Sequence, residues 1–163
     1  MRISCLLLVL AACGGGGTST QPTTPTNNTG SATVVEPAAP VENDTSICAN
    51  RPEQFGPLVL DATQAARRRG RDVTKFSAAK TTKEKPLEVC GIGQQVEWLM
   101  TATCEDGSRP YNDAQEVAQS RRGNVGPGGT CGTIIDLYVA TCPEGEYELH
   151  IDMYHCGPGE SFM

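Results

Sequence analysis

The chain has 163 residues, a net charge of −6 and a pI of about 4.9. An acidic chain of this kind is repelled by a phosphate backbone, so we expect no nucleic-acid partner. With one Trp and three Phe residues, its core is expected to be small and rich in aliphatic side chains. A small core usually needs additional covalent or metal support.

The first residues have the organisation of an export signal. Arg2 precedes an apolar run over residues 3–10, and the segment Leu10-Ala11-Ala12-Cys13 then leads into four glycines. The apolar run is too short to cross a bilayer as a helix. Ordinary cleavage before Gly14, which would secrete the chain without lipid, is the alternative interpretation.

The segment Leu10-Ala11-Ala12-Cys13 resembles the lipobox of bacterial lipoproteins. The resemblance implies removal of a signal peptide over 1–12, a diacylglyceryl thioether on the Cys13 sulfur and an acyl group on the new amine. Several acyl chains hold a protein stably at a membrane, whereas one holds it only marginally. In Gram-negative lipoproteins, a residue such as Gly14 after the lipidated cysteine usually accompanies sorting to the outer membrane. We therefore expect a lipid-anchored protein of the bacterial cell envelope, at the outer membrane.

Residues 13–46 predict a stalk. After Cys13 this segment consists mostly of Gly, Thr, Ser, Pro, Asn and Ala, without apolar periodicity. Such a composition cannot bury enough apolar surface to offset the entropy lost on folding, so we expect it to be disordered. The folded domain is therefore expected over residues 47–163.

Six cysteines fall in the expected domain, and their even number in an exported protein predicts three disulfides. Their spacing lacks the C-x-x-C pairs of zinc sites, so we expect no metal. The six are Cys48, Cys90, Cys104, Cys131, Cys142 and Cys156.

Two segments of the domain, 48–107 and 108–163, share the same order of sequence markers. Each contains a short helix followed by a loop, a strand and a tight turn, which indicates an internal duplication. The helices are expected over 61–70 and 113–123, and the strands over 99–104 and 137–142. The predicted fold class is therefore α+β, with two duplicated helix-strand units sharing a small antiparallel sheet.

The expected helices carry start and stop signals. Asp61 and Gln64 have the spacing of a capping box, and so do Asp113 and Glu116, or Asn112 and Gln115. Gly70 and Gly123 follow the last helical residues, where a left-handed cap belongs. Helices this short are not stable alone, so they are expected to pack on the strands.

The C-terminal residues predict a β-hairpin. Pro143-Glu144-Gly145 suits a three-residue turn, which would place Cys142 opposite Glu146. In this register one face carries Ile135, Leu137, Val139 and Thr141 with Tyr147, Leu149, Ile151 and Met153. The other, polar face carries Asp136, Tyr138 and Ala140 with Glu148, His150 and Asp152. The same register brings Cys131 beside Cys156, so we predict a Cys131–Cys156 disulfide. Three pairings stay open for the other four: Cys48, Cys90, Cys104 and Cys142.

The two histidines, His150 and His155, are the natural candidates for chemistry. Glu148, His150 and Asp152 alternate along one expected strand, but side chains on one strand face stand parallel and do not converge on an ion. His155 is expected to fill space at the strand end. No G-x-S-x-G motif accompanies them. We therefore predict no catalytic residues, no metal, no cofactor and no enzyme activity.

Two other motifs have plain structural interpretations. The glycine-rich residues 123–129 lack the Lys of a phosphate-binding loop, and Pro127 removes an amide donor, so we expect a connecting loop. Arg67, Arg68, Arg69 and Arg71 would suit an anionic polymer, but they spread around the helix axis. We expect them to form a solvated helix end that matches the helix dipole.

The leading functional hypothesis is a non-enzymatic interaction or structural domain with an unknown envelope or extracellular partner. The alternative is a hydrolase or a protein inhibitor acting on extracellular polymers or proteins. A hydrolase should show a pocket where polar groups converge, with His150 or His155 in it. An inhibitor should present a protruding loop, for which residues 71–86 or 123–130 are candidates. A binding module should show an exposed apolar or aromatic patch.

Overall fold

The computed structural model describes residues 45–51 and 56–163. The predicted signal peptide and almost all of the predicted stalk, including Cys13, lie outside these residues. Within the described part, no helix has both the length and the apolar character that a membrane span requires. The elements in chain order are η1 (Thr45–Asn50), β1 (Leu58–Val59), α1 (Ala62–Ala66), α2 (Phe76–Ala79), β2 (Leu87–Glu88), α3 (Gly91–Thr101), α4 (Ala114–Ser120), β3 (Arg121–Gly128), β4 (Thr133–Cys142), β5 (Gly145–Asp152) and β6 (His155–Cys156).

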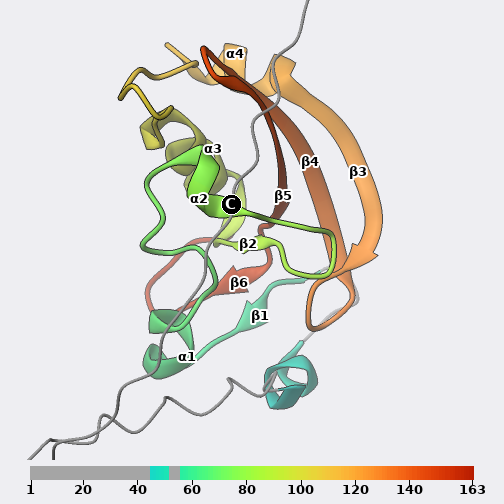
Figure 1. Ribbon diagram of the computed structural model, residues 1–163. Coiled ribbons are helices and arrows are strands. Elements are labelled where there is room, and N and C mark those ends of the chain that lie inside the picture. The colour runs from blue at the N-terminus through green and yellow to red at the C-terminus, as the bar shows by residue number, and fades with distance from the viewer. Residues whose placement is uncertain (1–44, 52–55) are drawn as a thin grey trace, which may run out of the picture. The chain divides into compact units, whose positions relative to one another are not determined.

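A four-stranded sheet in the order β2-β5-β4-β3 forms the framework of the domain (Figure 1). Strands β3, β4 and β5 are antiparallel, while the short β2 runs parallel to β5. A second sheet consists of β1 and β6, paired in parallel. The predicted α+β class is confirmed, but the four-stranded sheet is mixed and the two-stranded sheet is parallel, instead of one antiparallel sheet. The parallel pairs join segments far apart in the chain, which no short hairpin could connect.

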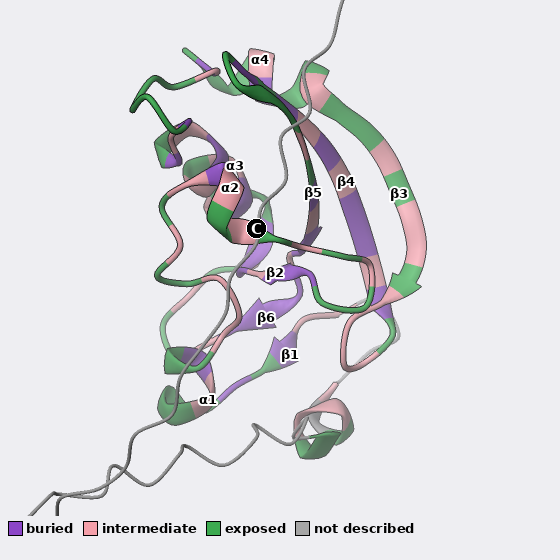
Figure 2. Ribbon diagram, viewed as in Figure 1, coloured by how far each residue is buried: buried purple, intermediate pink, exposed green. Residues whose placement is uncertain are grey.

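The main core lies between the four-stranded sheet and the helices α2, α3 and α4. Phe76 packs edge-on against Trp98 and Tyr111, with ring centroids 5.7 and 6.3 Å apart, an arrangement that aromatic quadrupoles favour. Leu99 and Leu149 are buried in the same cluster. Figure 2 shows burial along β4 and β6, whereas the edge strand β3 is exposed or half-buried.

A second, smaller core lies around β1. Leu58, Leu60 and Ala65 are buried there, and Ile47 and Cys131 pack against them. This cluster contains few large side chains, so it provides little hydrophobic stabilisation of its own. The segment around η1 therefore depends on a covalent link to the rest of the domain.

The predicted strand over 99–104 is wrong. Residues Gly91–Thr101 form α3, in which Gln95 and Leu99 are buried one helical turn apart. This four-residue spacing, together with helix-favouring Gln, Glu and Met residues, outweighs the resemblance to residues 137–142. The Gln95 amide donates a hydrogen bond to the Tyr138 hydroxyl and ties α3 to β4. The two matched segments therefore take different structures.

The start of α1 matches its prediction. The Asp61 carboxylate accepts a hydrogen bond from the Gln64 backbone amide at 2.8 Å. The Gln64 side-chain carbonyl accepts one from the Asp61 backbone amide at 2.9 Å. This reciprocal pair is a complete capping box. The helix nevertheless ends at Ala66, before the predicted Gly70. Gly70 has φ +80°, and a Cβ there would lie 2.1 Å from a Leu87 side-chain atom, so it allows close contact with β2.

The start of α4 matches only in part. Asp113 accepts hydrogen bonds from the amides of Gln115 and Glu116, each at 2.9 Å. The Glu116 carboxylate accepts a hydrogen bond from the Asn112 backbone amide at 2.7 Å. The predicted capping box would instead need the backbone amide of the capping residue, Asp113. The helix ends at Ser120 because the next residues pair with β4 as strand β3.

The glycine-rich segment 123–129 is mostly strand rather than the expected loop. Residues Arg121–Gly128 form β3, whose pairing with β4 shifts register twice. Pro127 has no amide proton, which an edge strand tolerates because its outer side has no partner strand. The register shifts interrupt the exposed edge, a common protection against unwanted pairing with other chains.

The predicted hairpin exists, but its register is shifted by one residue. Cys142 pairs with Gly145 and Thr141 with Glu146, so the turn contains two residues, Pro143 and Glu144. The core face of β4 consequently carries Tyr138, Ala140 and Cys142, all buried. The prediction assigned Leu137, Val139 and Thr141 to that face, and this assignment is wrong.

Asp136 explains why the prediction failed. The observed register places it opposite Ile151, with 7% exposure, on the face predicted to exclude it. Arg121 of the neighbouring strand donates to its carboxylate at 2.6 Å. A buried carboxylate is tolerated when it is paired and hydrogen-bonded. The compensation comes from β3, outside the two hairpin strands, so the alternation within the hairpin alone does not reveal it.

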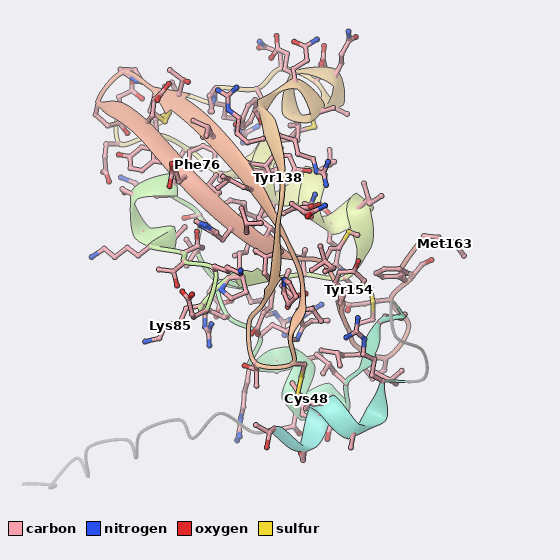
Figure 3. All side chains as sticks on the ribbon, turned by 90° about the vertical axis from the view of Figure 1, so that its right-hand side faces the viewer. Cys48, Phe76, Lys85, Tyr138, Tyr154 and Met163 are labelled. Atoms are coloured by element: carbon pink, nitrogen blue, oxygen red, sulfur yellow. A yellow bond between two sulfur atoms is a disulfide. The ribbon has the colours of Figure 1, made fainter. Side chains whose placement is uncertain are left out.

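The predicted Cys131–Cys156 disulfide is also wrong. The three bonds are Cys48–Cys131, Cys90–Cys156 and Cys104–Cys142. The chain leaves the hairpin after Asp152, so Cys156 belongs to β6 beside β1 and not to a continued β5. Figure 3 shows the sulfur–sulfur bond beside Cys48, close to η1. This bond supplies the covalent link that the small core requires.

We predict that Arg121→Gln lowers the free energy of unfolding by about 1–2 kcal/mol. The change leaves the Asp136 carboxylate partly buried without its partner. Urea denaturation is the measurement, and Arg122→Gln, one residue further along the exposed strand, is the matched control. Equal effects of the two substitutions would show that the ion pair does not support the hairpin register.

The Cys48–Cys131 bond is expected to be reduced before the other two. Its cysteines are half-buried, whereas the four other cysteines are at most 7% exposed, and attack by a thiolate requires access to the sulfur. Brief treatment with a mild reductant, alkylation and peptide mass spectrometry would detect the order. Simultaneous loss of all three bonds would contradict this expectation.

Candidate functional site

Asp152, His155 and Thr133 meet where β5, β6 and β4 end or begin. The Asp152 carboxylate accepts a hydrogen bond from the Thr133 hydroxyl and lies 3.0 Å from His155 Nε2. Its second oxygen accepts the Tyr154 amide at 3.1 Å. Thr133, Asp152 and His155 are each at most 1% exposed. The cluster therefore connects three strand ends inside the domain.

The order of groups in this cluster does not suit nucleophilic catalysis. In a catalytic triad the imidazole lies between the nucleophile and the carboxylate. Here the Asp152 carboxylate lies between Thr133 and His155, and the Thr133 hydroxyl is sealed from solvent. The expectation that His155 fills space at a strand end is confirmed, with an additional bond to Asp152.

Glu148 and His150 do not join this cluster. Glu148 is exposed, and the half-buried His150 donates its amide to the Thr81 hydroxyl at 2.9 Å. Among the described residues, one group of His, Cys, Asp and Glu side chains is close enough to share an ion, namely Cys104, Cys142 and Glu144. Both sulfurs there are joined in a disulfide and cannot act as thiolate ligands.

A groove of about 200 Å³ opens at the surface beside α3. Gln94, Glu97, Trp98 and Thr101 line one side, at positions that share one face of the helix. Residues of the 68–71 segment and of β2, together with Val89, line the other side. We call this site the α3 groove.

An ion pair holds one end of the α3 groove. Arg68 donates two hydrogen bonds to the Glu160 carboxylate at 2.6 and 2.7 Å and one to the His155 carbonyl at 2.9 Å. Gln94 donates to the same carboxylate at 3.0 Å. Burial opposes the ionisation of Glu160, but these bonds and the Gly157 amide outweigh it and lower its pKa to about 2. The bidentate geometry fixes the C-terminal segment against the residues that follow α1, and the Gln94 bond joins it to α3.

A wider hollow of about 330 Å³ lies beside α4 and β4. Some of its polar groups bind one another: the Tyr111 hydroxyl donates to the Val139 carbonyl at 3.1 Å, and the Glu116 carboxylate accepts from the Asn112 backbone amide at 2.7 Å. The α3 groove is the better candidate site because the Arg68–Glu160 ion pair holds its wall in place.

Comparison with known proteins gives no match: no family model, no curated protein and no solved structure is significantly similar to this chain. The assignment of a role therefore depends on the geometry of the domain.

Sequence reasoning did not find the α3 groove. The spacing of Gln94, Glu97, Trp98 and Thr101, at i, i+3, i+4 and i+7, was available as a signal. It requires a helix over these residues, and the resemblance of 99–104 to 137–142 indicated a strand instead. The opposite wall comes from β2, a two-residue strand that has no periodic signal of its own.

We expect stability to fall as the pH is lowered from 4.5 towards 2, with Glu160 contributing to the loss. Its pKa in the folded state is depressed below the ordinary 4.5, so its ionised form stabilises the fold above that pH. Glu160→Gln should lower the free energy of unfolding at pH 7 by about 2 kcal/mol and should reduce the acid dependence. Urea denaturation at several pH values measures both effects. The exposed Glu146→Gln is the control, and an unchanged acid dependence in Glu160→Gln would contradict the assignment.

Proposed function

We propose that this protein is a non-enzymatic binding domain of the bacterial cell envelope, anchored by lipid on Cys13 and presented by the stalk over residues 13–46. One observation carries the non-enzymatic part of the proposal. His155, which the sequence offers as a base, is sealed inside the domain at 1% exposure, while the surface groove contains no histidine. The chemistry of the interior is therefore separated from the surface that a partner would meet.

Three disulfides support an exported location, because such bonds persist in oxidising compartments. The lipobox resemblance supports the anchor. The two loops suggested for a protein inhibitor receive less support. Residues 123–128 belong to the edge strand β3, and residues 76–79 of the other candidate form α2, whose Phe76 is buried in the main core.

Labelled palmitate is expected to enter the full chain when it is produced in a Gram-negative host, and the labelled protein should fractionate with the outer membrane. Cys13→Ser should abolish labelling and release the chain from the membrane fraction. Cys5→Ser, inside the signal peptide, is the matched control and should label like the original chain. An unlabelled mature protein that begins at Gly14 would refute the anchor.

A further inference from the structure

We propose that the α3 groove binds one ring of an uncharged sugar. This inference rests on the proposed binding function and deepens it by naming the class of ligand. The groove lies between the face of α3 that carries Gln94, Glu97, Trp98 and Thr101 and the segment formed by residues 68–71 and β2. Its volume of about 200 Å³ suits a ligand smaller than the drug-sized molecules that typical pockets enclose.

The walls of the α3 groove are fixed before any ligand arrives. Arg68 is held by Glu160 and by the His155 carbonyl. Gly70 lies directly against Leu87, where no Cβ would fit without a shift. Trp98 packs edge-on against Phe76 and donates its indole N–H to the Val73 carbonyl at 2.9 Å. A preformed site loses little conformational entropy on binding.

The groups that remain available carry opposite charges. Arg71 and Glu97 are exposed, and neither forms an ion pair with any residue that the structure describes. Glu88 uses one carboxylate oxygen to accept the Arg69 amide at 2.9 Å, which leaves its other oxygen available. Because the Trp98 N–H already has a partner, its ring offers only apolar surface to the groove.

This combination selects a neutral ligand rich in hydroxyl groups. Two arginines and two glutamates line the groove, so neither an anion nor a cation finds a wall of purely opposite charge. A hydroxyl both donates to a carboxylate and accepts from a guanidinium, so one sugar ring can use Glu97 and Arg71 together. The apolar C–H face of such a ring can lie against the half-buried Trp98.

Trp98 also provides the measurement, because it is the only tryptophan of the chain. The full chain in detergent would be titrated with glucose, galactose, mannose and N-acetylglucosamine, and followed by tryptophan fluorescence and by calorimetry. We expect saturable binding of at least one sugar. Glu97→Gln and Arg71→Gln should each weaken it about tenfold, the effect of losing one charge-assisted hydrogen bond.

Controls and competing probes make the outcome decisive. Glu146→Gln and Arg67→Gln change exposed residues outside the groove and should leave the affinity within about twofold. If only glycylglycine binds, the ligand class is a zwitterion. If only inorganic phosphate binds, the ligand class is an anion. Either result, or neither signal nor heat with any sugar, overturns this inference. If no sugar binds but the full chain binds a component of an envelope extract, the sugar inference fails and the proposed binding function is retained.

Discussion

The pairing of β4 with β5 is the constraint on which the rest of the domain depends. Its register, with Cys142 opposite Gly145, turns Tyr138, Ala140 and Leu149 towards the core. The helices α2 and α3 pack against this face, and β2 and β3 extend the sheet from its two sides. A shift of β4 by one residue against β5 would turn Tyr138 and Ala140 to the opposite face.

The register is held by contacts from outside the hairpin. Arg121 of β3 neutralises Asp136 on the core face, and Cys104 anchors Cys142 beside the turn. The far end of the hairpin is held by Asp152, whose carboxylate binds Thr133 and His155. Polar and covalent contacts therefore stabilise the register, because the apolar burial in a core this small is not sufficient alone.

Burial also separates the groups that serve stability from those available to a partner. His155 and Asp152 are enclosed, whereas Arg71 and Glu97 face solvent on either side of a groove whose walls are fixed by Trp98 and Glu160. The first pair joins strand ends inside the domain. The second pair is accessible at the surface, and our proposal of a binding function rests on it.

Sequence alone determined the features that depend on neighbouring residues. These are the α+β class, the capping box of Asp61 and Gln64, the existence of the C-terminal hairpin and the presence of three disulfides. Only the tertiary structure decided the hairpin register, the parallel strands, the cysteine pairing and the α3 groove. Each of these joins residues distant in the chain, as in Cys48–Cys131 with a separation of 83 residues. Local patterns rank the partners of such residues poorly, because their choice depends on which charges and sulfurs the whole fold brings together.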